Sequence, residues 1–91
     1  MDLTIIIPVK NEENNISNIV ESINSKIKVG YDILFIDDFS EDGTVNVIKN
    51  FQKENDKIKL IKNKVKGLGE SVRNGIMHSN GQYLSILMCD G

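Results

Sequence analysis

Short apolar runs alternate with amphipathic segments along the whole chain. The run from Leu3 to Ile7 is rich in β-branched residues, and Ile33 to Ile36 is a second apolar run bounded by turn formers. Such runs predict short strands that are buried on both faces of a sheet. Between them, apolar residues recur at the i, i+3, i+4, i+7 spacing of a helix that packs on a sheet: Ile16, Ile19, Val20 and Ile23.

The first third of the chain therefore predicts a strand, a helix and a second strand. We expect Pro8 to end the first strand and the helix to cover about Glu12–Ser25. Asn11 is the expected N-cap, with Asn14 or Asn15 as later alternatives. A crossover of this kind joins parallel strands and is right-handed by the general rule.

Two further helix and strand pairs follow. The helix that starts after Thr44 is expected to end within 54–56, and 58–62 predicts an outer strand whose lysines discourage edge pairing. A third helix opens at 67–69 and stops at Asn80-Gly81, a common way for helices to end. Its expected apolar side consists of Leu68, Val72, Ile76 and Met77. A final apolar run, 83–88, predicts the fourth strand.

The element order predicts an α/β fold with three αβα layers, Rossmann-like, around a parallel sheet of strand order 3-2-1-4. This order places a crevice between the first and fourth strands, lined by Val9 to Glu12 on one side and Cys89-Asp90-Gly91 on the other. The fourth strand is apolar, yet nothing follows to cover it. We therefore expect residues 1–91 to be the N-terminal part of a larger domain, or the fourth strand to pair with another chain.

Composition narrows the class of protein. A chain of 91 residues forms one domain, and a net charge of −2 with both signs interspersed argues against a nucleic-acid partner. The single cysteine excludes an internal disulfide and predicts a reducing, cytoplasmic environment. No apolar stretch is long enough to cross a membrane.

The candidate chemistry starts at Asp37 and Asp38, directly after the central strand. Ligands of open α/β sheets bind outside the carboxyl ends of the strands, so this acidic pair is a candidate binding site. The alternative is structural: Asp38 or Asp42 caps the next helix, and Asp37 is merely solvated.

Four blocks of this chain, in order and spacing, resemble those of family 2 glycosyltransferases. They are Ile6-Ile7-Pro8-Val9-Lys10-Asn11-Glu12-Glu13, the stretch 35–44, the stretch 66–76, and Gly81-Gln82-Tyr83 leading to Met88-Cys89-Asp90-Gly91. The Gly67-Leu68-Gly69 block is most similar to the dolichol-phosphate mannosyltransferase branch.

The resemblance implies a GT-A fold and an inverting glycosyltransferase (EC 2.4) in glycan or cell-wall biosynthesis. Its donor would be a GDP- or UDP-linked sugar and its acceptor a polyprenyl phosphate as one option, which would place the parent at the cytoplasmic face of the membrane. Residues 1–91 would supply the nucleotide-binding half and would be inactive alone. The catalytic residues stay unassigned.

The resemblance also implies the site residues. Those expected to border the nucleotide are Pro8, Val9, Asn11, Glu12, Asp37, Asp38, Gly67 and Arg73. For Arg73, an ordinary surface position is an equal alternative. Asp90 matches the first carboxylate of an Asp-x-Asp motif that holds Mg²⁺ or Mn²⁺ against the diphosphate. Cys89 and His78 are expected to be structural.

Other classes of protein compete with this interpretation. A dinucleotide-binding Rossmann domain is disfavoured, because the turn after the first strand has no glycine for close pyrophosphate approach. A receiver-like or flavodoxin-like signalling module would bind Mg²⁺ through acids at strand ends. A non-catalytic module would use the open fourth strand only for association, including homo-oligomers.

Overall fold

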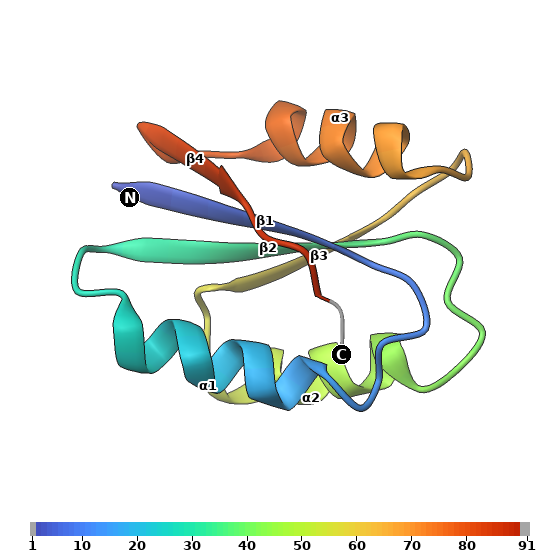
Figure 1. The fold of residues 1–91 in the computed structure, drawn as a ribbon, viewed down its shortest axis with the longest axis horizontal. Helices are drawn as coiled ribbons and strands as arrows, with labels where there is room; N and C mark the ends of the chain where they lie inside the picture. The colour runs from blue at the N-terminus through green and yellow to red at the C-terminus, as the bar shows by residue number, and fades with distance from the viewer. Residues whose placement is uncertain (1, 90–91) are drawn as a thin grey trace.

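A computed structural model describes residues 2–89 of the chain. The elements follow in the order β1 (Leu3–Val9), α1 (Ile16–Lys26), β2 (Tyr31–Asp37), α2 (Thr44–Glu54), β3 (Ile58–Lys62), α3 (Leu68–His78) and β4 (Tyr83–Ile86). The four strands form one parallel sheet in the order β3-β2-β1-β4, which confirms the predicted topology. The loops after β1, β2 and β3 meet at one end of this sheet (Figure 1).

Helices cover the two faces of the sheet unequally. Helices α1 and α2 lie on one face and α3 on the other, so the chain has the three layers that the sequence predicts (Figure 1). The main apolar cluster lies between the sheet and α1 and α2, and its largest fully buried side chain is Phe35. On the α3 face the buried apolar cluster is limited to Ile6, Leu34 and Ile36.

The first strand continues past Pro8, contrary to prediction. Pro8 lies opposite Ile36 and Val9 opposite Asp37 in the β1–β2 ladder. The Ile6 carbonyl accepts a hydrogen bond from Leu87 N on the β4 side. Backbone groups two residues apart point the same way, so the donor that Pro8 lacks would face that side, beyond the last β1–β4 pair. Proline therefore costs no ladder hydrogen bond here.

Helix α1 begins at Ile16, four residues later than predicted, with Asn15 at the N-cap position. Residues 11–13 instead form a loop whose backbone N–H groups bond to side chains of the loop before α2 and of Thr44, the first residue of α2. Asn15, one of the later alternatives, therefore occupies the cap position, but its side chain makes no capping hydrogen bond and donates to Glu12 Oε1 instead. Helix α2 ends where the sequence predicts.

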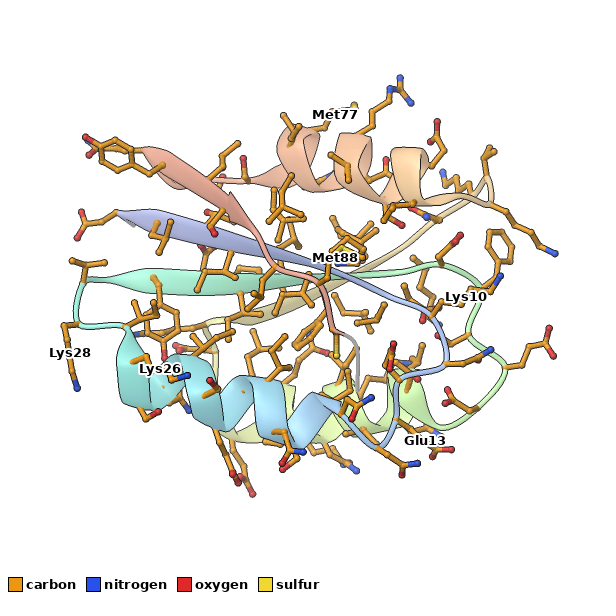
Figure 2. All side chains as sticks on the ribbon, in the orientation of Figure 1. Lys10, Glu13, Lys26, Lys28, Met77 and Met88 are labelled. Carbon is orange, nitrogen blue, oxygen red and sulfur yellow. The ribbon has the colours of Figure 1, made fainter. Side chains whose placement is uncertain are left out.

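The buried side of α3 is not the side that its apolar residues predict. Leu68, Ile76 and Met77 are at least half exposed, and Figure 2 shows Met77 on the outer side of the helix. The helix residues that are buried are Ser71 and Gly75. Small residues at i and i+4 allow α3 to approach the sheet closely, and a Cβ at Gly75 would lie 2.4 Å from Ile6 Cγ2.

Strand β4 is shorter than predicted and stands open. It ends at Ile86 rather than residue 88, and all four of its side chains are exposed, Tyr83 by 70%. Among residues 2–89, no helix is long and apolar enough to span a membrane.

Candidate functional site

A crevice opens at the carboxyl ends of the strands beside the switch point between β1 and β4, the position that the sequence predicts. It is a hollow of about 270 Å³ whose walls come from the β1 end, the β2 end, the first turn of α3 and the segment after β4. Its lining residues are Pro8, Val9, Lys10, Glu12, Asp38, Leu68, Ser71, Met88 and Cys89. Four of the predicted site residues, Pro8, Val9, Glu12 and Asp38, are therefore brought together here. Cys89 is 5% exposed in one wall, as expected for a structural residue.

Two acidic residues, Glu12 and Asp38, line the crevice, and the loop before α3 holds the carboxylate of Asp38. Its Oδ1 accepts hydrogen bonds from Gly67 N at 3.0 Å and from Asn63 Nδ2 at 3.2 Å, and its Oδ2 lies 3.2 Å from the same Gly67 N. A carboxylate accepts about four hydrogen bonds, so Oδ2 retains capacity for a donor in the crevice. The carboxylate is thus fixed in place yet able to bind a ligand N–H group.

Asp37 faces the other side of the sheet. Successive side chains of a strand alternate between faces, so the adjacent acids Asp37 and Asp38 diverge. Asp37 is 4% exposed and lines a separate hollow of about 340 Å³ with Val45 and Asn46 of α2. The expectation of two acids at one mouth is therefore wrong, and so is the alternative of a solvated Asp37.

The environment of Asp37 is that of a structural acid. Its Oδ2 accepts a hydrogen bond from Ser40 N at 3.3 Å, while the buried Oδ1 has no hydrogen-bond partner among the described residues. Lys62 is its register neighbour on β3 and lines the same hollow. Lys62 is exposed, however, and no ion pair joins it to Asp37 among residues 2–89.

A clamp of hydrogen bonds joins the loops after β1 and β2. Asn11 adopts a left-handed conformation at φ 54°, its N–H donates to Ser40 Oγ at 2.9 Å, and its Oδ1 accepts from Glu41 N at 2.7 Å. Glu12 N donates to Thr44 Oγ1 at 2.8 Å. Asn11 thus acts in the loop rather than as the predicted helix cap, and it does not line the crevice.

Asp42 anchors the same clamp. It accepts hydrogen bonds from Thr44 N at 2.9 Å, from Thr44 Oγ1 and from Glu13 N at 3.3 Å. The hydroxyl of Thr44 and these backbone N–H groups hold the pKa of Asp42 below its ordinary value, against a smaller opposing effect of desolvation. The N-cap position of α2 is Gly43, so the alternative in which Asp38 or Asp42 caps this helix is wrong: Asp42 lies one residue before the cap and accepts from the first N–H group of α2.

Gly67 and Arg73 lie outside the crevice lining. Gly67 has a φ of 130°, a backbone conformation that residues with a side chain rarely adopt. Its N–H group donates to Asp38. Arg73 has a side chain 66% exposed and an ion pair with Glu70 at 3.6 Å on the outer side of α3. Asp90, the expected metal ligand, lies outside the described residues. Among 2–89, no group of three or more His, Cys, Asp or Glu side chains could hold a metal ion together.

A buried polar group that sequence reasoning missed lies under α3. Asn63, 6% exposed, and Ser71, fully buried, join Asp38 to the helix through an Nδ2 to Oγ hydrogen bond of 2.8 Å. Two signals could have found it. Asn63 follows β3 directly at the functional end of the sheet, and Ser71 and Gly75 form a small-residue stripe at i and i+4.

Comparison with known proteins agrees with this architecture. The family model described as glycosyl transferase family 2 matches residues 4–91. A dolichyl-phosphate β-glucosyltransferase of Dictyostelium discoideum is 30% identical over 100 residues, which cover 98% of this chain and 31% of that protein. The GalNAc(5)-diNAcBac-PP-undecaprenol β-1,3-glucosyltransferase of Campylobacter jejuni is 30% identical over 87 residues, covering 93% of this chain and 28% of that protein.

Solved structures share the fold. TarS of S. aureus in complex with UDP superposes with a TM-score of 0.87 at 18% identity, over 99% of this chain and 28% of that one. The mannosyltransferase PcManGT of Pyrobaculum calidifontis, in complex with GDP-Man and Mn²⁺, superposes with a TM-score of 0.87 at 19% sequence identity, over 97% of this chain and 27% of that one. The fold is thus the α/β fold of GT-A glycosyltransferases. The chain spans about three tenths of the length of these proteins.

Proposed function

This chain belongs to glycosyl transferase family 2, and on that premise we propose that it supplies the nucleotide-binding half of an inverting glycosyltransferase. The parent enzyme would transfer a sugar from a nucleotide diphosphate sugar to an acceptor. The observation that supports this most is the crevice at the switch point between β1 and β4, where a fixed carboxylate faces an apolar wall.

The lining of the crevice suits a nucleotide. Pro8, Val9 and Leu68 provide apolar surface for a flat base, which also explains why Leu68 is 54% exposed. Oδ2 of Asp38 would accept an N–H group of the base. Lys10 is the one positively charged residue of the lining and suits the diphosphate.

The remaining predicted residues would act indirectly. Asn11 and Asp37 hold the loops after β1 and β2, and Gly67 holds Asp38. We propose that these three shape the crevice without contacting the nucleotide. Arg73 would be an ordinary surface residue, because its side chain is exposed and paired with Glu70.

For the metal, we propose Mg²⁺ or Mn²⁺ bound together with the nucleotide. Among 2–89 the protein offers no cluster of three ligands, so the ion would depend on the diphosphate and on Asp90. When bound, it would neutralise charge on the leaving diphosphate. We expect weak metal binding in the absence of nucleotide.

For the acceptor, we propose a polyprenyl phosphate at the cytoplasmic face of the membrane. Both relatives compared above carry a lipid phosphate or diphosphate in their names. A phosphate acceptor is already an anion and needs little help from a general base. The isolated chain is expected to be inactive in sugar transfer.

Calorimetric titration with GDP and UDP, each with and without Mn²⁺, tests the nucleotide site. We expect Asp38→Asn to weaken the preferred nucleotide by about tenfold or more, the loss of a hydrogen bond to a charged group. Asp37→Asn should weaken the affinity less than Asp38→Asn does, because the Asp37 side chain lies on the other face and does not contact the nucleotide. Equal weakening by both changes would contradict the proposal, as would a folded wild-type chain that binds neither nucleotide.

Self-association through β4 is a second proposal, favoured by its uncharged and fully exposed edge. Residues 83–88 contain no charged side chain, whereas the opposite edge, β3, carries Lys59 and Lys62. Sedimentation equilibrium should show a dimer that Leu84→Lys separates into monomers. Val29→Lys, which changes another exposed apolar residue, should leave the dimer intact. A monomeric wild-type chain would reject this proposal.

A further inference from the structure

Asn63 connects the crevice carboxylate to α3. Its side chain is 6% exposed, and Nδ2 donates to Asp38 Oδ1 at 3.2 Å and to Ser71 Oγ at 2.8 Å. Its Oδ1 accepts a hydrogen bond from Asn74 Nδ2 at 2.7 Å. The two amide hydrogens and the amide oxygen therefore all have partners, from the β2 end and from two successive turns of α3.

The partners also fix the orientation of the amide. A carboxylate only accepts hydrogen bonds, so the Asn63 nitrogen must face Asp38, and the Asn74 amide nitrogen only donates, so the Asn63 oxygen must face it. A flipped amide would lose both hydrogen bonds. The backbone is fixed as well, because Asn63 N donates to Asp37 O at 2.8 Å.

We infer that Asn63 is a positioning residue that sets the orientation of Asp38 for nucleotide binding. This inference rests on the proposed function of the crevice. Apart from Asn63, the donor to the Asp38 carboxylate within residues 2–89 is Gly67 N, which lies near both oxygens and so leaves rotation about the bond to the carboxyl group poorly constrained. The Asn63 amide donates to Oδ1 and not to Oδ2, so the two oxygens are no longer equivalent. This hydrogen bond restricts rotation of the carboxylate and directs Oδ2 to the crevice.

A neutral amide is the side chain that suits this position. In an Asn63→Asp variant, the new carboxyl group would face Asp38 across about the same distance, and two carboxylates that close share one proton. When protonated, the new group could donate to Asp38 and accept from Asn74 as the amide does. When ionised, it would repel Asp38.

Other charged groups surround this pair. Lys10 and Glu12 line the crevice with Asp38, and Asp37, Asp42 and Lys62 line the hollow under α2 with Asn63. Lys64 follows Asn63 in the chain. From α3, Glu70 and Arg73 pair with each other on the outer side. These groups are the same in the variant, so a new pH dependence would arise from the added carboxylate.

The test compares Asn63→Asp with Asn50→Asp, the same chemical change at an exposed position of α2. Affinity for UDP and GDP with Mn²⁺ is measured at pH 8 and pH 5.5 and divided by the wild-type value at the same pH. We expect Asn63→Asp to bind at least about tenfold more weakly at pH 8 and to approach wild type at pH 5.5. Asn50→Asp should match wild type at both.

A second readout needs no nucleotide. The Gly67 amide proton donates to Asp38, so its NMR chemical shift reports the carboxylate directly. Between pH 8 and pH 5.5 this signal should move further in Asn63→Asp than in wild type or Asn50→Asp. A wild-type chain without nucleotide affinity would defeat the proposed function, while a moving Gly67 signal would still support the positioning of Asp38.

Two outcomes would overturn the inference. One is an Asn63→Asp variant that matches Asn50→Asp in affinity at both pH values and in its Gly67 signal. The second outcome is loss of the fold in both Asn63→Asp and Asn63→Ala, which would make Asn63 a core residue only.

The Asn63→Ala variant covers the case in which Asn63→Asp does not fold at pH 8. It adds no charge, so we expect it to fold and to bind the nucleotide weakly at both pH values.

Discussion

The two faces of the sheet differ in the polarity of their buried side chains. The face under α1 and α2 holds a continuous apolar cluster with Phe35 at its centre, and three buried residues of α1 pack into it. The face under α3 holds three buried apolar residues and a set of buried polar ones: Thr4, Asp32, Asn63 and Ser71. The difference indicates that one face provides most of the stability, while the other positions Asn63 and Ser71 beside the crevice, with Thr4 and Asp32 at the opposite end of the strands.

Asp37 and Asp38 show this division within two residues. Asp37 points to the apolar side and is nearly inaccessible, with one hydrogen bond to its side chain among the described residues. Asp38 points to the polar side and accepts from Gly67 and Asn63. Identical side chains thus acquire a structural role and a candidate binding role from the face on which each lies.

The largest effect is expected from Phe35→Ala. Phe35 is fully buried under α1 and α2, so its truncation leaves a cavity and should cost about 3–5 kcal/mol of unfolding free energy. That is a large share of a total on the order of 5–15 kcal/mol. Urea unfolding followed by circular dichroism measures it.

The control for Phe35→Ala is Leu68→Ala on the α3 side. Leu68 is 54% exposed, so its truncation should change stability by less than about 0.5 kcal/mol. A similar loss from both variants would show that the two faces contribute equally and would break the comparison.

A smaller effect is expected from Gly75→Ala. The added methyl group would meet Ile6 Cγ2 at 2.4 Å and push α3 from the sheet, at a cost of about 1–3 kcal/mol. Gly69→Ala in the same helix meets nothing within 4 Å and should instead stabilise by up to about 1 kcal/mol, the gain in helix propensity. Thermal or urea unfolding of the two variants gives the comparison. If both raised the stability, close packing of α3 would be refuted.

The smallest effect concerns Asp42, which is exposed and screened by solvent. Hydrogen bonds from Thr44 and Glu13 lower its pKa from the ordinary 3.8, so the folded state favours the ionised form. Its contribution to stability is complete above about pH 3.8 and disappears as the pH falls through the lower folded-state value. Unfolding at pH 5 and pH 3 should show a smaller difference in Asp42→Asn than in wild type. Asp56→Asn, at another exposed position, should retain more of the wild-type difference.

Much of the fold could be predicted from local patterns. Apolar runs of β-branched residues identified the strands, and the helical spacing of Ile16, Val20 and Ile23 identified the side of α1 that packs on the sheet. The strand order follows from the alternation of helix and strand with one switch of direction, and this order predicts where the crevice lies. Among the predicted site residues, those that line the crevice do so because they lie at or just after the carboxyl ends of β1 and β2: Pro8, Val9, Glu12 and Asp38.

Other features depend on contacts between distant segments. Helix α1 starts late because residues 11–13 bond to a loop 29–32 residues further along the chain. Pro8 stays in its strand because β4 ends before reaching it. In α3, the close approach to Ile6 selects Ser71 and Gly75 over the larger apolar residues.

The roles of Asp37 and Asp38 separate what the sequence determines from what the tertiary structure decides. The sequence alone predicts that Asp37 and Asp38 lie at the end of a buried strand, at the ligand-binding end of the sheet. It does not show which face each carboxylate takes, because both registers of the strand bury apolar residues on either side. Tertiary structure decides it: α2 closes over Asp37, while Gly67 and Asn63 draw Asp38 to the crevice.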